Sequence, residues 1–366
     1  MISDRVKKSL KREFYQSRSA QVGLALVVII LLTAVFAPML APHNPTTQRV
    51  GTGDTAELTD LPPLSPVPGH EFVGTREQSI VNETTGEFRN VQQEVPANAS
   101  HPLGTNERGQ DILSRMIYGA RVSMLVGLLG AALAAIVGVP YGLVAGYFGG
   151  RLDDGLMRAA DVMLAFPSLV LAIALIGVFR DTSFHTAQLP DPFVAAAQGD
   201  LVPNILIPRA GHVATMPETT TFPVTVTLVV ALVNWVWFAR IARGEALSIR
   251  SEEYVTAARS LGASNTTILR QHILPNAITP IIVLATIQVA FIILLEASLS
   301  FLGFSGTNLT WGADIQQGRN GLSSGKWWVS TMPGIAIVLA VVGVNLLGDW
   351  LRDALDPGIQ GETGGV

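Results

Sequence analysis

The apolar positions of this chain are gathered into six long runs that polar segments separate. A helix needs about 20 predominantly apolar residues to cross a bilayer, and each run reaches about that length. We therefore expect six transmembrane helices, near residues 21–41, 122–148, 157–179, 222–242, 277–302 and 331–350. The first run exceeds the apolar part of a signal peptide, and Pro38 and Pro42 replace a small-residue cleavage site, so it is expected to remain as an anchor.

The composition agrees with a chain embedded in a membrane. Hydrophobic residues make up 49% of it and charged residues 14%, whereas soluble domains carry roughly 25% charged residues. A formal net charge of −4 argues against nucleic-acid binding, which usually needs a clustered basic face. The predicted fold class is an all-α polytopic membrane protein, with the lipid bilayer as a partner and no nucleic acid.

The placement of Lys and Arg predicts the orientation, because cytoplasmic loops carry the excess of basic residues. Basic residues crowd the segment before the first span, between residues 5 and 18. Arginines also recur in the loop at 243–276, whereas Arg209 is the one basic residue inside the loop at 180–221. Both termini are therefore expected in the cytoplasm of a multi-pass protein of the cell membrane.

This topology divides the chain into segments. They are a cytoplasmic N-terminus (1–20), the first span (21–41), an extracytoplasmic insert (42–100), a core with five spans (101–357) that includes an extracytoplasmic loop (180–221) and a cytoplasmic loop (243–276), and a cytoplasmic tail (358–366). The insert lacks sustained hydrophobic periodicity. A segment that cannot bury apolar surface is usually disordered or loosely structured; the alternative is a small cap that faces a partner.

Glycines and prolines inside the spans predict how the helices pack and bend. Gly142 and Gly146 have the spacing that lets another helix approach closely, and packing within the bundle is the simplest interpretation. Pro140 and Pro167 each remove a backbone hydrogen bond and are expected to bend their helices.

Two ionisable residues lie in or near the spans, where charge is costly enough to suggest function. Asp161 is expected about one turn from the inner surface, either solvated or paired with Arg158. Glu296 is deeper. It either lines a translocation path or bonds Ser298, Ser300 or a neighbouring helix, and the sequence leaves both readings open.

The chain lacks the common motifs of catalysis. It has no phosphate-binding G-x-x-x-x-G-K-[ST] loop, no H-E-x-x-H and no G-x-S-x-G. It has no cysteine, and its histidines are scattered without the paired spacing of a metal site. We therefore expect no catalytic residue, no metal site and no cofactor bound by this chain.

The polar segment between the fourth and fifth runs has a helical pattern. Residues 252–261 suit a short helix that Gly262 ends, Ser264 can cap a second helix at 265–272, and Pro275 begins the next span. Ala257 and Ala258 leave one face shallow, and apolar anchors stand at Tyr254, Leu261, Ile268 and Leu269. The pair either lies on lipid headgroups or docks to a cytoplasmic partner.

This segment, EEYVTAARSLGASNTTILRQHILPNA, resembles the EAA loop of ABC importer permeases. The matching positions are Ala257, Ala258, Gly262, Leu274 and Pro275. Thr256 and His272 depart from the motif in the way the peptide-transporter branch does. Further stretches resemble the dipeptide, oligopeptide and nickel permeases in order: HPLGTNERGQDILSRMIYGARVS, DVMLAFPSLVLAIAL, ARIARGEALSIRSEEYV, EASLSFLG and LLGDWLRDALDP.

The resemblance implies a type I ABC importer permease fold with cytoplasmic coupling helices. Its expected partners are a homologous second permease, two ATPase subunits that bind ATP and Mg, and an extracytoplasmic substrate-binding protein. The expected ATPase-coupling contact comprises Glu253, Tyr254, Ala257, Ala258, Gly262, Ala263 and Ser264. Arg240 and Pro275 are expected to attach the loop to the spans, and Glu296 stays a candidate for the translocation path.

The same resemblance favours short peptides as substrates, with nickel or another small solute as the alternative. The main alternative of another class is an ATP-independent carrier or channel. On any of these readings the chain is a transporter component and not an enzyme.

Overall fold

The computed structural model describes residues 14–48, 59–65, 72–81, 88–179, 182, 184–199 and 209–355. The predicted tail at 358–366, much of 1–20 and parts of the insert at 42–100 lie outside these residues. Five described helices are long and apolar enough to cross a membrane. They are α2 (Arg18–Val35), α4 (Ile112–Phe148), α9 (Val224–Ile249), α12 (Leu274–Phe301) and α14 (Trp328–Leu355). The predicted polytopic helical fold is confirmed.

The span expected at 157–179 is a broken one. It consists of α5 (Gly150–Leu164) and α6 (Ser168–Phe179), whose axes differ by 87°, and the count of spans reaches six if this pair is one of them. Pro167 lies at the break, where it disfavours helical geometry in the preceding residue. Pro140, by contrast, lies inside α4, which continues past it to Phe148.

The helices α4 and α9 extend beyond the ranges that hydropathy indicates. α4 begins at Ile112 instead of near 122, because the Asp111 carboxylate accepts a hydrogen bond from the Ser114 backbone N–H at 2.8 Å and caps the helix. α9 continues to Ile249 instead of ending near 242. Hydropathy marks only the apolar part of a helix, whereas these helices carry polar turns beyond it.

At the centre of the bundle, α4 packs closely against α9. Gly138, Gly142 and Gly146 of α4 face the α9 backbone, and a Cβ atom at Gly146 would lie 2.5 Å from the carbonyl oxygen of Arg243. Only glycine allows backbones to approach this closely. The prediction that Gly142 and Gly146 serve packing within the bundle is confirmed.

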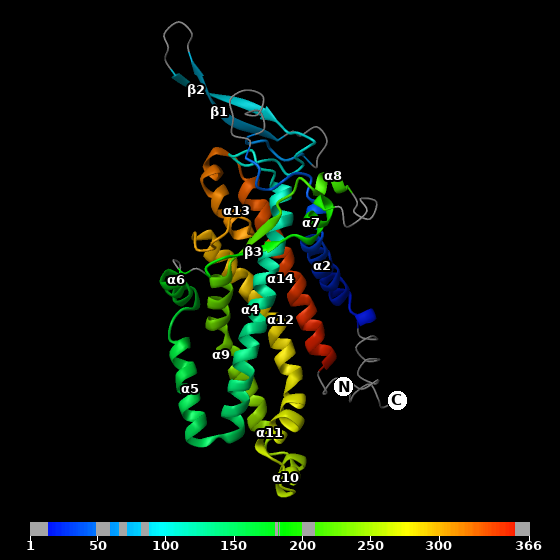
Figure 1. Ribbon diagram of the computed structural model, residues 1–366, viewed down its shortest axis with the longest axis vertical. Helices are drawn as coiled ribbons and strands as arrows, with labels where there is room; N and C mark the ends of the chain where they lie inside the picture. Colours follow the sequence, from blue (N-terminus) through cyan, green and yellow to red (C-terminus); the bar gives the residue numbers. More distant parts are fainter. Residues whose placement is uncertain are drawn as a thin grey trace.

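Short elements lie at the two ends of the bundle (Figure 1). At one end, α10 (Glu253–Ser260), α11 (Asn265–Ile268) and a π-helical turn, η3 (Leu269–Ile273), connect α9 to α12. At the other end are α3 (Ala37–Leu40), β1 (Val73–Val81), β2 (Phe88–Pro96), β3 (Ala187–Pro190), α7 (Pro192–Gln198), α8 (Ala210–Val213), β4 (Thr219–Phe222), α13 (Trp311–Gly318) and a 3₁₀ helix, η4 (Arg319–Ser324).

The strands form two antiparallel pairs. β1 pairs with β2, with Val73 opposite Pro96, and β3 pairs with β4, with Ala187 opposite Phe222. The described part of the insert therefore holds a hairpin and is not loosely structured throughout. Its role as a cap that faces a partner stays a prediction.

Candidate functional site

The turn between α10 and α11 is a well-formed helix end. Gly262 has a φ of 84°, in the left-handed region that favours glycine. Its N–H donates to the Arg259 carbonyl at 3.0 Å, and the Ala263 N–H donates to the Ala258 carbonyl at 3.1 Å. This pair of bonds is the Schellman arrangement, and it confirms the prediction that Gly262 ends the first helix.

The second helix begins as predicted and continues further than expected. Ser264 Oγ accepts a hydrogen bond from the Thr267 N–H at 3.2 Å, which confirms the cap. The expected separation between a helix at 265–272 and a span that starts at Pro275 is wrong, because α11, η3 and α12 form one continuous rod from Asn265 to Phe301. Pro275 has no N–H to donate, and the wider π turn lies immediately before it.

One face of the helix pair is anchored in the bundle. Val255, Ile268 and Ile273 are fully buried and belong to the same apolar cluster as residues of α9. The sequence suggested that Ile268 is an anchor for a partner. Its side chain is buried in the bundle instead, so that prediction is wrong. The hydroxyl of Tyr147, near the end of α4, donates to Asn265 Oδ1 at 2.8 Å and ties the second helix of the pair to α4.

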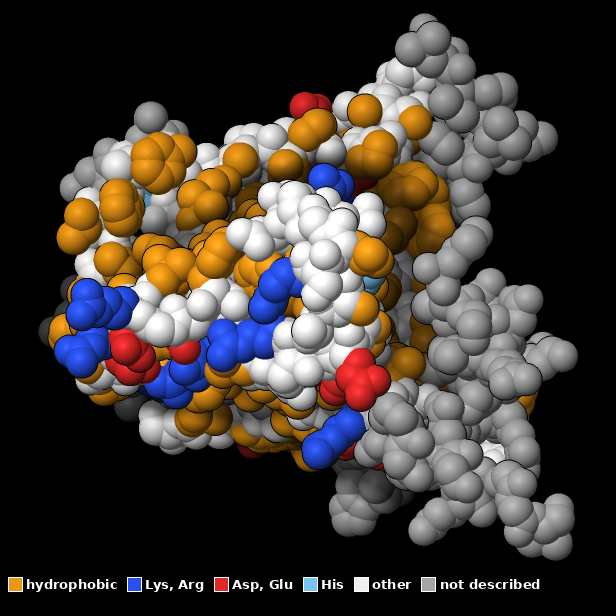
Figure 2. Space-filling model, turned by 90° about the horizontal axis from the view of Figure 1, so that it is seen from below, with side chains coloured by type: hydrophobic (Ala, Val, Ile, Leu, Met, Phe, Trp, Pro, Cys, Tyr) orange, Lys and Arg blue, Asp and Glu red, His pale blue; other side chains and the backbone are white. Residues whose placement is uncertain are grey.

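The opposite face is exposed. Leu261 at the turn is 88% exposed and Tyr254 is 44% exposed. Figure 2 views this end of the molecule and shows Lys and Arg side chains gathered beside apolar surface. The remaining predicted contact residues divide into exposed ones (Glu253, Ala257, Gly262, Ser264) and half-buried ones (Ala258, Ala263). The structure thus brings all of the predicted contact residues together on one protruding element.

Two arginines of α9, the predicted Arg240 and also Arg243, pair with carboxylates of α5 near this end. Arg240 bonds Asp161 at 2.7 Å and so links α9 to α5, and Asp161 pairs with it instead of with Arg158. Arg243 holds both carboxylate oxygens of Asp153, at 2.5 and 2.7 Å. A bidentate pair of this kind fixes geometry better than a single contact. Arg243 was read from the sequence only as a topology signal.

Glu296 lies inside the bundle and is 1% exposed. Its carboxylate accepts hydrogen bonds from Ser300 Oγ at 2.5 Å and from Ser123 Oγ of α4 at 3.0 Å. Ser298 instead donates to the Leu294 carbonyl. Of the two readings that the sequence left open, bonding to Ser300 and a neighbouring helix is the one observed; a role in the translocation path stays a prediction.

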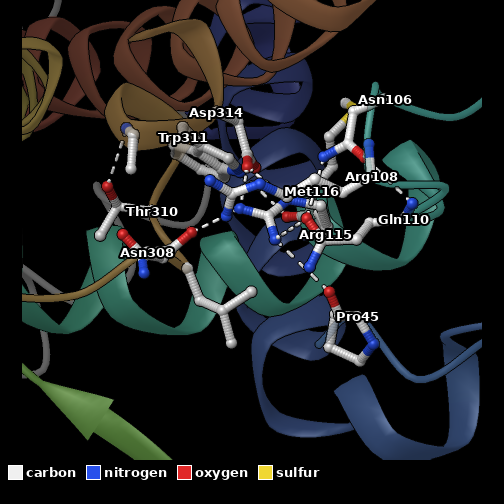
Figure 3. A network of polar contacts seen from close by, with 12 residues as sticks. Pro45, Asn106, Arg108, Gln110, Arg115, Met116, Asn308, Thr310, Trp311 and Asp314 are labelled. Atoms are coloured by element: carbon white, nitrogen blue, oxygen red, sulfur yellow. Dashed lines mark hydrogen bonds and ion pairs between the residues drawn. The ribbon is translucent and has the colours of Figure 1, made fainter. Parts of the chain in front are cut away.

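A buried polar network organises the other end of the bundle (Figure 3). Arg115, near the start of α4, donates to Asp314 Oδ1 of α13 from Nε at 2.6 Å and also contacts it through Nη2 at 2.5 Å. Further bonds reach Gln110 Oε1 at 3.0 Å and the Asn308 carbonyl at 2.5 Å. Arg115 and Asp314 are each 2% exposed and lie 199 residues apart in sequence. No local pattern could pair them.

Two histidines and an aspartate meet at the same end, contrary to the expectation that the histidines are scattered. His101 Nδ1 lies 2.9 Å from Asp111 Oδ1, and His43 Nδ1 lies 3.9 Å from Asp111 Oδ2. The two imidazole rings stack with centroids 4.3 Å apart. Burial would raise the pKa of Asp111, but hydrogen bonds from His101 and Ser114 outweigh it and hold that pKa well below its usual range.

Two family descriptions match the sequence. Residues 138–361 match "Binding-protein-dependent transport system inner membrane component", and residues 9–63 match "N-terminal TM domain of oligopeptide transport permease C". The first match covers the broken span, α9, the helix pair, α12 and α14.

Curated relatives align along most of the chain. A probable D,D-dipeptide transport system permease protein of Escherichia coli is 33% identical over 92% of this chain and 87% of its own length. A dipeptide transport system permease protein of Bacillus subtilis is 30% identical over 95% of this chain and 85% of its own. A chain of the inward-facing methionine ABC transporter MetNI aligns at 16% identity and a TM-score of 0.46, over 67% of this chain and 98% of that one.

Proposed function

Because the chain belongs to the family of inner membrane components of binding-protein-dependent transport systems, we propose that it forms half of the translocation pathway of an ABC importer for short peptides. It is a multi-pass protein of the cytoplasmic membrane. In this proposal, the helix pair faces the cytoplasm and transmits the movement of an ATPase subunit to the spans. Both termini are then cytoplasmic, and the β hairpin is extracytoplasmic.

The observation that carries the proposed coupling role is the contrast between the two faces of the helix pair. An apolar side chain that is 88% exposed, Leu261, stands beside small residues on a turn whose other face is packed in the bundle. Exposed apolar side chains gathered on one element suit a partner surface. Since α11 continues into α12 without a break, a push on this turn would move a whole span.

The remaining partners follow from the same family membership. ATP and Mg would bind to two ATPase subunits, a homologous permease would complete the pathway, and an extracytoplasmic binding protein would deliver the substrate. The names of these relatives, which refer to dipeptides, support short peptides over nickel or another small solute. Glu296, held between α12 and α4, would stabilise the bundle in every conformation that keeps its serine bonds.

Replacing Leu261 with Ala tests the docking role directly. Truncating an anchor at a protein interface costs about 2 kcal/mol, which corresponds to roughly 30-fold weaker binding. We expect Leu261→Ala to lose most of the stimulation of ATP hydrolysis by loaded binding protein in liposomes. Ser260→Ala is the matched control, because the neighbouring Ser260 is also exposed and its hydroxyl donates to the Thr256 carbonyl within α10.

The level of permease in the membrane reports whether a variant folds and inserts. Its copurification with the ATPase reports whether it docks. Leu261→Ala that inserts normally yet keeps full stimulation would overturn the coupling assignment. Transport that persists in liposomes without ATP would instead favour the ATP-independent carrier.

The substrate class is tested on the cognate binding protein. A ligand that binds only the folded state raises the unfolding temperature according to its occupancy. We expect di- and tripeptides to raise it at micromolar concentration, and Ni²⁺ chelates and sugars to leave it unchanged. A shift with a nickel chelate and none with peptides would contradict the peptide assignment while leaving the coupling role intact.

A further inference from the structure

The cluster of His43, His101 and Asp111 has no role in the transport function proposed above. His43 follows α3, and the other two residues belong to the loop before α4, so two separate segments converge here. The donor atoms of the three residues lie within 4.8 Å of one another. They line a cavity of about 250 Å³ to which His212 also contributes.

The histidines have bonding capacity left over. Nδ1 of His43 and Nε2 of His101 are buried and have no hydrogen-bond partner among the described residues. The His101 side chain is 2% exposed and the Asp111 side chain is fully buried. Buried polar atoms are normally paired, so the unpaired Nδ1 of His43, which lies 3.9 Å from Asp111 Oδ2, indicates a ligand that supplies the missing partner. A cation held by His43 Nδ1, His101 Nδ1 and the carboxylate would replace the hydrogen bond that now joins His101 to Asp111.

The carboxylate is already held in position. Ser114 donates to Asp111 Oδ2 from its N–H at 2.8 Å and from its hydroxyl at 2.6 Å. The same hydroxyl accepts the backbone N–H of His43 at 2.9 Å. Outer bonds of this kind orient the residues that bind metals. The His43 side chain is 25% exposed and provides a route of entry.

The donor set and its spacing select the kind of cation. Two ligands of a tetrahedral Zn²⁺ at about 2.0–2.1 Å lie about 3.4 Å apart, and the nitrogen-to-oxygen distances of 2.9 and 3.9 Å bracket that value. Imidazole with carboxylate suits Zn²⁺ and related transition ions, whereas Mg²⁺ and Ca²⁺ prefer oxygen ligands alone.

We propose that His43, His101 and Asp111 bind one divalent transition cation, with Zn²⁺ as its representative, each residue supplying one donor. The ion clips the segment after α3 to the start of α4. It is a resident ion and not cargo, because its ligands belong to the framework that also caps α4. This site is independent of the proposed substrate and of the coupling helices.

The purified full-length chain in detergent allows a direct test. After treatment with a chelator, it is titrated with Co²⁺, which gives visible absorption bands when bound in tetrahedral geometry, and Zn²⁺ is then added as competitor. We expect one equivalent of Co²⁺ to bind, Zn²⁺ to displace it, and Zn²⁺ to raise the unfolding temperature.

Variants identify the ligands without disturbing the cap of α4. Loss of an outer partner alone weakens metal binding about 10–100-fold, so His43→Gln and His101→Gln should each weaken Co²⁺ binding by at least about tenfold. His185→Gln is the matched control, since His185 also has a buried nitrogen without a hydrogen-bond partner in the described part of the chain but lies outside the cluster. His43→Gln leaves both Ser114 bonds to Asp111 in place, so the variant is expected to fold.

Two results would overturn the site. One is wild-type protein that binds less than half an equivalent of Co²⁺ at micromolar concentration. The other is binding that His43→Gln and His101→Gln leave unchanged, which would assign the ion to other residues.

Discussion

At the scale of single residues, the ion pairs of this structure differ in how deeply their charges are buried. Arg115 and Asp314 pair with each other, and each is 2% exposed. Arg240 and Asp161 also pair with each other, but their side chains are 46% and 58% exposed. Removing one partner of a buried pair leaves an uncompensated charge in a medium of low dielectric, but an exposed partner is solvated by water. The two pairs therefore differ in what they contribute to stability.

Arg115→Met is expected to destabilise the protein by about 3–5 kcal/mol, because it leaves the Asp314 carboxylate buried without its cation. Arg240→Met is the matched control, and it should cost about 0–1 kcal/mol. Thermal unfolding of both variants in detergent measures the difference. Equal losses of stability would contradict the assignment, and adding Asp314→Asn to Arg115→Met should recover part of the loss.

At the scale of elements, backbone chemistry decides where helices stop, bend and continue. Gly262 ends α10 through a left-handed conformation, and Pro167 breaks the third predicted span into two helices. Pro140 does not break α4, which is held against α9 along its glycine face. The same residue type thus has different outcomes, since the helix continues past Pro140 and is interrupted at Pro167.

Gly262→Ala separates backbone strain from steric obstruction at the coupling turn. An L-residue with a side chain pays about 1–2 kcal/mol in the left-handed conformation, although a Cβ atom there would meet no heavy atom of the described residues within 4 Å. We expect the turn to distort, and stimulation of ATP hydrolysis by loaded binding protein to fall while the variant still inserts.

Gly244→Ala is the control for that experiment. Gly244 lies within α9 and its added Cβ would likewise meet nothing within 4 Å among the described residues, but its backbone is helical. Alanine favours helices over glycine, so this variant should keep wild-type stimulation. An equal loss in both variants would remove the turn conformation as the cause.

At the scale of the whole molecule, the two ends of the bundle have separate tasks. The helix pair lies at one end and the strands and the Arg115 network lie at the other (Figure 1). In the proposed orientation, the first end meets the ATPase and the second meets the binding protein. The network would then hold α13 against the extracytoplasmic end of α4 while the cytoplasmic ends of the spans move.

Single cysteines test this orientation cleanly, because the chain has no cysteine of its own. We expect Leu261→Cys to react with a membrane-impermeant maleimide only in inside-out vesicles, and Thr219→Cys in β4 to react only in intact cells from which any outer envelope has been removed. Both positions are exposed. Labelling of both from the same side would reject the topology.

The sequence by itself determined the membrane class, the positions of most spans and the helix pair with its Gly262 end and Ser264 cap. These features depend on local properties: the length of apolar runs, the conformational freedom of glycine and hydrogen bonds between near neighbours. Even the family emerged from short contiguous motifs. Local chemistry was sufficient to predict a segment wherever its own residues form its backbone hydrogen bonds and determine whether it faces lipid or water.

Only the tertiary structure decided which distant residues meet. It paired Arg115 with Asp314, brought His43 to Asp111, turned Ile268 inward and chose Arg240 as the partner of Asp161. Each contact depends on helices that arrive from far along the chain, and its energy depends on burial that the whole bundle creates. The physical reason is that the low dielectric and the close packing of a core exist only after the segments have assembled.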